Sequence, residues 1–394
     1  MPKLCVIGFG HRSGYMTSEL LKLAPEIKLA AVVDPDPNTL ERVKKCVDDI
    51  SDVRHFASVD AWLEEADQHD AVMIGSRCNL HTPLAIKVAG LGIPLFLEKP
   101  IAIDRPQLGD LYSAYKDKKL QVVVSFPLRV TPLFIKALEI VRSGRLGTIN
   151  QIQAVNNVTY GGIYFSEPYR EHDLTGGLWL QKATHDFDCL NLLVDSMPTR
   201  IAATSTQRIY GGDKPHDLRC SQCDETETCK ASPQNLERTG DKNRSGIGFG
   251  DHGCVYGSEI RNQDAGSALL EYENRINVTY TQNFATRRGA GRRSVTITGE
   301  DGTVDFDWRT EQIRIHDHYS DDIEPIEIKA TTGHGGGDIG LLVNFREMIA
   351  GDAESISPLH GGLLSAAMCL AADESCRSNA FEDIPMRDEI AAMF

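Results

Sequence analysis

The sequence predicts two parts of different architecture: an N-terminal α/β part with a doubly wound parallel sheet, and a C-terminal α+β part with a largely antiparallel, open sheet. Over residues 1–124, short apolar runs alternate with segments of helical periodicity, which is typical of parallel β-α-β units. From residue 125 onward, closely spaced strand-like runs favour an antiparallel sheet with helices on one face. At 394 residues the chain is long enough for more than one domain.

The N-terminal part is expected to form one sheet, because right-handed crossovers join its successive strands. The expected strands are Lys3–Ile7, Ile27–Val33, Ala71–Ile74, Pro94–Leu97 and Leu120–Val124, and the expected helices are Ser13–Ala24, Asn38–Asp48, Pro83–Gly90 and Arg105–Tyr115.

The C-terminal part is expected to begin with a helix and a strand and to continue, after a long polar segment, as a meander of strands. The helix is predicted at Pro132–Ser143 and the strands at Ile149–Asn156, Ser267–Tyr272, Ile276–Gln282, Ser294–Gly299, Thr303–Trp308 and Gln312–His316. We therefore expect domains at 1–124 and 125–394. Residues 206–254 are expected to be a cysteine-containing insertion, because this stretch is long, polar and without periodicity.

Composition and charge exclude several classes of function. The chain carries 41 Lys and Arg against 56 Asp and Glu, a formal charge of −15, which disfavours nucleic acid and anionic membrane surfaces as partners. A hydrophobic content of 41% and a charged content of 25% are typical of a globular protein. No export signal and no membrane-spanning run is evident, so a cytoplasmic protein is expected.

The first strand runs into a glycine-rich turn that opens a helix. Gly8 permits the tight turn, and Gly10 permits a pyrophosphate to approach the backbone N–H groups at the helix N-terminus. Ser13 replaces the third glycine of the usual fingerprint and is small enough for close helix–strand packing. About twenty residues later, Asp34 ends the second strand, where a carboxylate binds ribose hydroxyls. The predicted dinucleotide site comprises Gly8, Gly10, His11, Arg12, Ser13 and Asp34.

The residues around Asp34 favour NAD over NADP. Pro35 follows the aspartate, and no arginine stands beside it to neutralise a 2′-phosphate. The preference is modest because Arg12 lies in the glycine turn, so NADP remains the less favoured cofactor.

Glu98-Lys99-Pro100 follows the strand at Pro94–Leu97 and places a carboxylate and an amine where open α/β sheets bind ligands. Taken alone, the tripeptide is more typical of a solvated turn than of a ligand site. Together with IGFGHRSG, VVDPDP, SRCNLHTPLAIKVAG and SGRLGTI, it resembles the Gfo/Idh/MocA family of nicotinamide-dependent oxidoreductases. The resemblance runs from Met1 to the helix near Cys376.

The resemblance implies a Rossmann domain with Lys99 beside the nicotinamide and the substrate as a proton-transfer group, and Glu98 near the nicotinamide ribose. It also implies a bond to Pro100 that is often cis. Ser76 offers a hydroxyl near the cofactor, whereas His81 either contacts the cofactor or caps a helix. Cys78 replaces the family's asparagine, and Arg129 matches a position at the domain boundary, where it is expected to bind substrate.

The segment GGLWLQKATHDFDCLNLL has two interpretations. Lys182, His185, Asp186 and Cys189 fall at helical offsets of three and four, so they form either the polar outer face of an amphipathic helix or an acid–base group. The resemblance implies an active-site histidine at His185, although Gln181 occupies the position of the family's aspartate. Because glutamine cannot accept a proton, we assign its place in catalysis to Lys182.

The remaining cysteines and histidines do not define a metal site. Four cysteines, Cys220, Cys223, Cys229 and Cys254, are compatible with structural zinc, reduced thiols or disulfides. The other six cysteines, Cys5, Cys46, Cys78, Cys189, Cys369 and Cys376, are expected to pack as small apolar residues. His316 and His318 are expected on a sheet surface, and His334 either reaches the active site or is an exposed hinge residue.

We therefore predict an NAD-dependent oxidoreductase that transfers hydride to or from a hydroxylated carbon of a sugar, polyol or related small molecule. Lys99, His185 and Lys182 are the predicted catalytic residues, and Arg129, Lys182 and His185 the predicted substrate-binding residues. Two alternatives remain: a glycoside-cleaving enzyme that uses NAD for transient oxidation and elimination, and a non-catalytic nicotinamide-sensing protein. The resemblance further implies a homo-oligomer formed through the C-terminal sheet.

Overall fold

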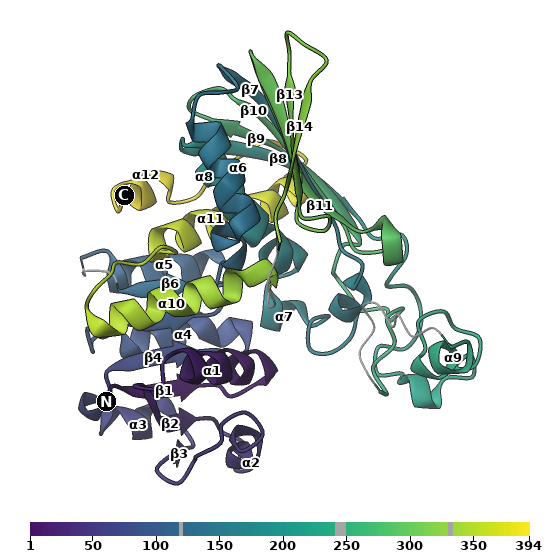
Figure 1. Cartoon of the computed structure of the whole chain (residues 1–394). Coiled ribbons are helices and arrows are strands. Elements are labelled where there is room, and N and C mark those ends of the chain that lie inside the picture. The colour runs from purple at the N-terminus through teal and green to yellow at the C-terminus, as the bar shows by residue number, and fades with distance from the viewer. Residues whose placement is uncertain (118–120, 241–249, 330–333) are drawn as a thin grey trace. The chain divides into compact units, whose positions relative to one another are not determined.

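The computed structural model describes residues 1–117, 121–240, 250–329 and 334–394. These residues form two compact units, each with its own sheet (Figure 1). The first unit comprises residues 1–135, 330–367 and 386–394, and the second comprises residues 136–329 and 368–385. The chain therefore returns to the first unit after completing most of the second. The domain bounds 1–124 and 125–394 stay a prediction.

The first unit contains a six-stranded parallel sheet with the order β3-β2-β1-β4-β5-β6. Its strands are β1 (Lys3–Ile7), β2 (Lys28–Val33), β3 (Arg54–Phe56), β4 (Ala71–Ile74), β5 (Leu95–Leu97) and β6 (Val122–Val124). The strand order reverses between β1 and β4, which makes the carboxyl ends of these strands the expected ligand-binding edge. The prediction of a doubly wound parallel sheet is confirmed.

Some elements of the first unit differ from the predicted ones. The predicted helix Asn38–Asp48 is only the short α2 (Thr39–Val43), because Thr39 and Val43 alone are buried on it and successive turns follow. Strand β3 and the short α3 (Val59–Leu63) were not predicted. Residue 120, where the last strand was expected to begin, lies outside the described residues.

Helices from both ends of the chain complete the core of the first unit. Its N-terminal helices are α1 (His11–Leu23), α4 (Cys78–Val88) and α5 (Arg105–Tyr115), and its later helices are α10 (Gly337–Ala350), the first part of α11 (Leu359–Ser378) and α12 (Arg387–Ala391). Leu341, Leu342 and Phe345 of α10 belong to the same buried apolar cluster as Val6 of β1. The rings of Phe345 and Phe96 meet edge to face at 5.5 Å. The helix α10, from near the C-terminal end of the sequence, therefore covers apolar side chains of the parallel sheet.

The second unit contains a nine-stranded sheet with the order β14-β13-β12-β11-β7-β10-β9-β8-β15. Its strands are β7 (Ile149–Asn157), β8 (Pro198–Thr206), β9 (Ala265–Tyr272), β10 (Asn277–Asn283), β11 (Arg292–Gly299), β12 (Gly302–Asp307), β13 (Gln312–Asp317), β14 (Ile323–Glu327) and β15 (Glu382–Asp383). All strand pairs are antiparallel except β7 with β10. The predicted antiparallel sheet is confirmed, but the predicted meander is wrong: β7 lies between β10 and β11, and residues 284–291 cross over it.

The helices of the second unit are the end of α6 (Pro132–Arg142), α7 (His172–Thr175), a π-helical turn at Trp179–Ala183 that continues into α8 (Thr184–Val194), α9 (Pro233–Arg238) and the later part of α11. Of these, α8 packs against the sheet, whereas α9 lies apart from the sheet, within residues 206–254 (Figure 1). Phe187 of α8 meets the ring of Tyr280 at 5.2 Å, and Tyr272 donates a hydrogen bond to Asn191. These contacts hold α8 against β9 and β10.

The predicted insertion at residues 206–254, of which residues 241–249 lie outside the described residues, packs into an apolar cluster that it shares with residues 158–178 and 255–284. Tyr210 stacks on Phe165 with ring centroids 4.1 Å apart, and Leu236 and Val255 are buried in the same cluster. This packing accounts for a long polar segment that lacks periodicity. Nowhere in the described part of the chain is a helix both long and apolar enough to cross a membrane.

Candidate active site

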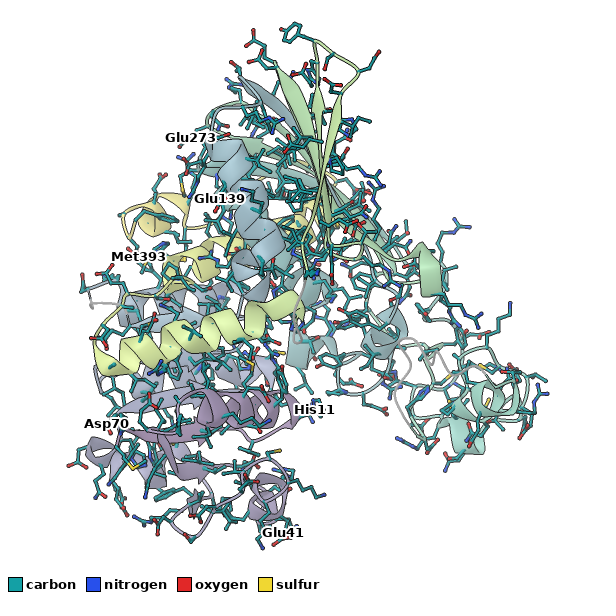
Figure 2. The ribbon with its side chains drawn as sticks, in the orientation of Figure 1. His11, Glu41, Asp70, Glu139, Glu273 and Met393 are labelled. Atoms are coloured by element: carbon teal, nitrogen blue, oxygen red, sulfur yellow. The ribbon has the colours of Figure 1, made fainter. Side chains whose placement is uncertain are left out.

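The glycine turn lies at the carboxyl end of β1 and has the geometry of a phosphate cradle. Gly8 has a φ of +79°, and a Cβ there would lie 2.6 Å from the Cα of Ser76. Gly10 precedes α1, and a Cβ there would meet nothing within 4 Å. His11 is exposed at the start of the helix, whereas Asp70 lies at the opposite end of the unit (Figure 2). The turn therefore leaves open space beside a helix N-terminus, which suits the pyrophosphate of a dinucleotide.

Ser13 takes the structural place of the third glycine. Its Oγ accepts a hydrogen bond from the N–H of Gly10 at 2.9 Å and donates one to the carbonyl of Gly8 at 2.7 Å. A Cβ on Gly75 would lie 2.7 Å from the Cβ of Ser13, so the helix and β4 approach closely. Ser13 both closes the turn and permits this packing.

Asp34 lies at the end of β2 and contacts the glycine turn. Its carboxylate accepts hydrogen bonds from the N–H of Phe9 at 2.9 Å and from the N–H of Asp36 at 3.0 Å. Arg42 of α2 places Nη2 3.3 Å from Asp34 Oδ2 and also contacts the carboxylate of Asp36. The prediction that no arginine stands beside Asp34 is therefore wrong, because α2 turns Arg42 back toward the end of β2.

Glu98, at the end of β5, is held by side chains from distant parts of the first unit. Arg12 donates from Nε to Glu98 at 3.0 Å and from its two terminal nitrogens to Asp338 at 2.9 and 2.6 Å. Ser125 donates to Glu98 at 3.0 Å, and His334 lies 2.9 Å from Asp338. The guanidinium of Arg12 is thus engaged by carboxylates and orients Glu98.

The ionisation of Asp338 follows from the same contacts. Burial raises the pKa of this carboxyl, but hydrogen bonds from His334 and Arg12 outweigh burial and hold the pKa well below its ordinary range. A charged carboxylate is therefore maintained beside Arg12. Neither Asp338 nor Ser125 was predicted as part of the site.

The turns that carry Ser76 and Lys99 are joined by His81. The peptide bond between Lys99 and Pro100 is cis. His81 is buried, with Nδ1 2.8 Å from the carbonyl of Pro100 and Nε2 3.1 Å from the carbonyl of Ser76. Burial lowers its pKa, so the neutral ring is favoured. A neutral ring carries one N–H, so His81 donates a hydrogen bond to one of these two carbonyls and lies against the other, which places it between the two turns.

Arg129 lies in a short 3₁₀ turn, Pro127–Val130, of the first unit. The side chain is buried, and its Nη1 donates to the carbonyl of Ile356 at 2.8 Å. Burial and the charge of Arg129 lower the pKa of His360 to about 4. The predicted substrate-binding role of Arg129 stays a prediction.

In the second unit, the predicted acid–base residues are buried. The residues Gln181, Lys182, His185, Asp186 and Asp188 are each less than 8% exposed. This burial shows that the interpretation as a solvated outer helix face is wrong.

Lys182 lies in the π-helical turn before α8 and faces two tyrosines. Its Nζ donates a hydrogen bond to the hydroxyl of Tyr160 and lies 4.5 Å from the ring centroid of Tyr160 and 5.6 Å from that of Tyr164. π-Helical turns occur frequently at functional sites. Tyr160 follows β7 and was not predicted, because no spacing in the sequence relates it to Lys182.

Asp186, directly after His185, fixes α8 to the sheet. It accepts hydrogen bonds from Asn156 of β7 at 2.8 Å, from Tyr280 of β10 at 2.8 Å and from Arg293 of β11 at 2.8 Å. Gln181 donates to the carbonyl of Thr175 at 3.0 Å and so has a structural contact of its own. Three strands thus fix the helix that carries His185.

The structure gives the zinc interpretation of residues 220–254 no support. All ten cysteines are free, so the disulfide interpretation is wrong. Burial, followed by the neighbouring Cys229 and Cys254, raises the pKa of Cys220 to about 12, so this side chain is a neutral thiol in the absence of a metal ion. Within the residues that the structure describes, no three His, Cys, Asp or Glu side chains are arranged to hold a metal ion.

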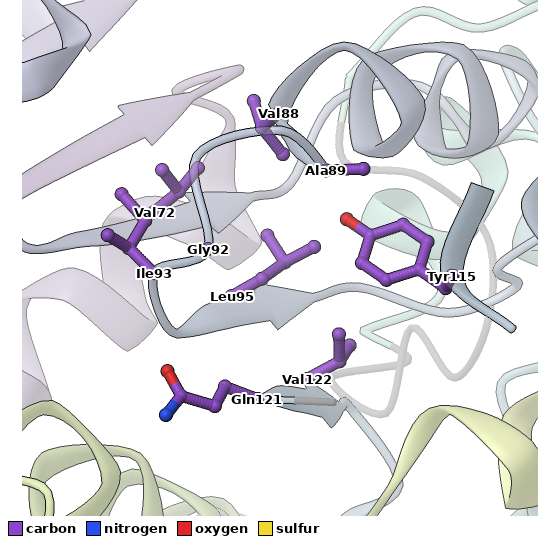
Figure 3. A pocket seen from close by; sticks show the side chains of 9 residues that line it. All are labelled: Val72, Val88, Ala89, Gly92, Ile93, Leu95, Tyr115, Gln121 and Val122. Atoms are coloured by element: carbon purple, nitrogen blue, oxygen red, sulfur yellow. The ribbon is translucent and has the colours of Figure 1, made fainter. Parts of the chain in front are cut away.

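An apolar cavity of about 40 Å³ lies near the amino ends of β5 and β6, opposite the carboxyl ends that carry the predicted cofactor site (Figure 3). Its lining includes Leu95, which begins β5, Val122, which begins β6, and Tyr115 of α5. The cavity has room for about one small group and lies away from the glycine turn. It is therefore a packing defect and not a cofactor site.

Within the first unit, the structure brings Gly8, Gly10, Ser13, Asp34, Ser76 and Glu98 to the carboxyl edge of one sheet. His81 contacts the backbone carbonyls of Ser76 and Pro100 at this edge, and Lys99 follows Glu98 in the sequence. Within the second unit, it places Lys182 and His185 on successive turns of one buried helix.

Comparisons with known proteins agree with this arrangement. Residues 3–126 match the oxidoreductase family with an NAD-binding Rossmann fold, and residues 134–305 match the GFO/IDH/MocA C-terminal domain. YteT of Bacillus subtilis (strain 168), named only as an oxidoreductase, is 24% identical over 358 residues, which cover 82% of each chain.

Two further similarities concern proteins with named substrates. The inositol 2-dehydrogenase of Rhizobium meliloti (strain 1021) is 26% identical over 200 residues, 51% of this chain and 57% of that protein. A levoglucosan dehydrogenase solved with NADH and levoglucosan has a similar fold, with a TM-score of 0.75 and 15% identity over 98% of this chain and 99% of the other. The two matched regions show that the chain belongs to the Gfo/Idh/MocA family and is an NAD(P)-dependent oxidoreductase.

Proposed function

We propose that the protein uses NAD in preference to NADP and transfers hydride between the cofactor and a hydroxylated carbon of a cyclic polyol or sugar. Family membership supports the reaction type. The substrate class is supported by relatives named for inositol and by a similar fold solved with levoglucosan. The carboxylate of Asp34 supports NAD, because it suits a free ribose 2′-hydroxyl and repels a 2′-phosphate.

The first unit supplies the residues that hold the cofactor. Gly8 lets the turn pack against Ser76, Gly10 leaves room for the pyrophosphate, and Asp34 takes the adenosine ribose. Glu98 and Ser76 lie where the nicotinamide end is expected. The bound nicotinamide supplies the acceptor for hydride. Lys99 follows Glu98 directly and is proposed to hydrogen-bond the reacting hydroxyl.

The observation that carries the catalytic proposal is the burial of Lys182 in a π-helical turn, hydrogen-bonded to Tyr160. Oxidation of an alcohol releases a hydride and a proton from one H–C–O–H group, so a side chain must take the hydroxyl proton. We assign this proton to the group formed by Lys182 and His185, since Gln181 cannot accept it. In the reverse direction, the same group returns the proton to the carbonyl oxygen.

We also propose self-association through the outer face of the nine-stranded sheet. Apart from Leu269, the side chains that alternate outward at the hollow on β8, β9 and β10 are small or polar, and this hollow of about 610 Å³ is lined by Leu269, Thr281 and Phe381. Such a partly apolar sheet face suits pairing with a second copy of the sheet. Light scattering on the purified protein tests this, and a monomer at micromolar concentration would contradict it.

The function is tested by incubating the purified protein with inositols, levoglucosan and simple sugars, each with NAD and with NADP, and following reduced cofactor by absorbance. We expect NADH to accumulate with at least one cyclic polyol or sugar. Product formation without NADH would favour transient oxidation and elimination. No NADH binding and no turnover would contradict the proposal.

The catalytic residues are tested with single variants. We expect Lys182→Met to lower turnover by roughly a hundredfold or more while NADH affinity changes by less than about threefold. Lys136→Met is the matched control, because Lys136 lies exposed on α6 and pairs only with Glu139 in the interactions described for it. An undiminished rate would remove Lys182 from the mechanism, and full activity of Lys99→Ala would do the same for Lys99.

A further inference from the structure

Tyr160 lies between β7 and the 3₁₀ turn Gly161–Phe165 and joins a buried amine to the surface. Tyr160 is 44% exposed, whereas Lys182, which donates a hydrogen bond to its hydroxyl, is 5% exposed. A Cβ on Gly161 would lie 1.9 Å from the carbonyl oxygen of Phe284, so the backbone beside Tyr160 packs directly against the chain that follows β10. Tyr160 is therefore held in place by its neighbours while its side chain remains accessible.

The contacts of Lys182 suit an ammonium ion. Its Nζ donates to the hydroxyl of Tyr160 and lies 4.5 and 5.6 Å from the ring centroids of Tyr160 and Tyr164. Aromatic faces attract a cation, and an ammonium has three donors but no acceptor. In this arrangement Lys182 supplies positive charge, but it has no lone pair with which to take a proton from a substrate.

A second cation faces Tyr160 from β11. Burial opposes the charge of Arg293, but the carboxylate of Asp186 and then Tyr160 outweigh burial and raise the pKa of Arg293 above its ordinary value. Arg293 is paired with Asp186, so Lys182 is the cation in direct contact with the Tyr160 hydroxyl. Neighbouring positive charge favours the charged form of an acid, which for tyrosine is the phenolate.

Tyr280 of β10 has the opposite environment. It is fully buried and donates a hydrogen bond to Asp186 at 2.8 Å. Burial and the negative charge of Asp186 raise the pKa of Tyr280 well above its ordinary value, so this side chain stays a neutral phenol. Of the two tyrosines that contact the segment carrying His185, Tyr160 is thus the one whose hydroxyl faces a cation.

We propose that Tyr160 is a further catalytic residue: its phenolate oxygen takes the hydroxyl proton of the substrate alcohol, and Lys182 is the cation that stabilises the phenolate. This inference rests on the proposed function and extends the group of Lys182 and His185 by the residue that receives the proton. In oxidation, the substrate O–H bond breaks, an O–H bond forms on Tyr160, and hydride from the same carbon passes to the bound nicotinamide. The exposed phenol then releases its proton to solvent, and in reduction it donates a proton to the carbonyl oxygen.

Phenolate absorbance tests the inference without a substrate. The ultraviolet difference between the unchanged protein and Tyr160→Phe isolates the titration of this tyrosine. We expect a midpoint about one pH unit or more below the value of about 10 that an ordinary tyrosine has. In Lys182→Met, measured against the double variant Y160F/K182M, the midpoint is expected to rise by about one unit or more. An ordinary midpoint in the unchanged protein would overturn the inference.

Turnover gives the second test, with the inositol, levoglucosan or sugar that the unchanged protein oxidises fastest. We expect Tyr160→Phe to lower kcat by roughly a hundredfold or more while the Kd for NADH stays within about threefold. Lys182→Arg keeps a cation that cannot give up its proton, so it is expected to be roughly tenfold or more faster than Lys182→Met. Tyr319→Phe is the matched control, because Tyr319 is 78% exposed between β13 and β14.

The outcomes separate this inference from the proposed function. A Tyr160→Phe rate within about threefold of the unchanged rate, or folded Lys182→Arg protein as slow as Lys182→Met, would overturn the role of Tyr160 and leave the dehydrogenase proposal intact. If the unchanged protein neither binds NADH nor oxidises any compound of the panel, both fail. Loss of turnover in Tyr160→Phe with NADH binding retained supports the inference, and thermal melting shows whether each variant is folded.

Discussion

Replacing Arg293 with methionine removes the cation that faces Asp186 inside the second unit. The Asp186 carboxylate is 7% exposed and Arg293 is 17% exposed, and Nε and Nη2 of Arg293 lie 2.8 and 2.7 Å from the same carboxylate oxygen. Asn156 and Tyr280 donate to the other oxygen, each at 2.8 Å. The substitution leaves the carboxylate buried with two neutral donors and no cation.

The expected cost follows from that geometry. Removing one partner of a buried ion pair costs roughly 3–5 kcal/mol, because the remaining charge stays desolvated. The hydrogen bonds from Asn156 and Tyr280 persist, so we expect the free energy of unfolding to fall by about 3 kcal/mol, at the lower end of that range. Asp186→Asn is expected to cost a similar amount, since it leaves the guanidinium of Arg293 unpaired.

Urea denaturation followed by tryptophan fluorescence measures these changes, because Trp179 is buried just before α8. The double variant R293M/D186N removes both charges, and its cost is expected to fall short of the sum of the single costs by about 2–3 kcal/mol. Arg200→Met is the control: it breaks an exposed pair with Glu271 and is expected to cost less than about 1 kcal/mol. Additive single effects, or an Arg293→Met cost below about 1 kcal/mol, would refute the reasoning.

The remaining predictions concern pH, the glycine turn and metal content. Burial and the charge of Arg129 lower the pKa of His360 to about 4. Below pH 6.5 the unfolded state therefore binds more protons than the folded state, and the free energy of unfolding falls as the pH drops toward 4. In acid denaturation curves, His360→Gln is expected to remove roughly 1 kcal/mol of this loss. Gly8→Ala is expected to weaken NADH binding by roughly tenfold and to destabilise the protein by about 1–3 kcal/mol, because Gly8 has a positive φ and lies in a crowded turn. Gly90→Ala is the control and is expected to do neither, since a Cβ on Gly90 would meet no atom within 4 Å. Elemental analysis of protein purified without added zinc is expected to find no stoichiometric zinc, and one zinc atom bound per chain through residues 206–254 would contradict this.

The parallel sheet and its glycine turn were predictable because their signals are local. Apolar runs of strand length alternate with helical periodicity, and the carboxyl ends of parallel strands meet at one edge. Gly8, Asp34 and Glu98 follow three such strands, so their convergence follows from topology alone. The same reasoning found the antiparallel class of the second sheet.

The features that were missed depend on contacts between distant residues. Asp338 reaches Arg12 only because α10 returns to the first unit, and the orientation of Arg42 is set by a short helix whose periodicity is weak. Tyr160 meets Lys182 through a π-helical turn, which has no sequence signature at this length. Pattern reasoning also joined β10 to β11 as neighbours, because it had no means of placing the earlier β7 between them.

The apolar contribution of α10 to the first unit has a consequence for the order of folding during synthesis. Phe96 and Val123 are buried in a cluster that includes Leu342 and Phe345 of α10. At roughly 5–20 residues per second, α10 leaves the ribosome on the order of ten to forty seconds after β6. The nascent parallel sheet is therefore unsealed on one face throughout that interval, while β7 to β14 are already available to pair. The first unit therefore cannot complete its core until most of the second unit has been synthesised.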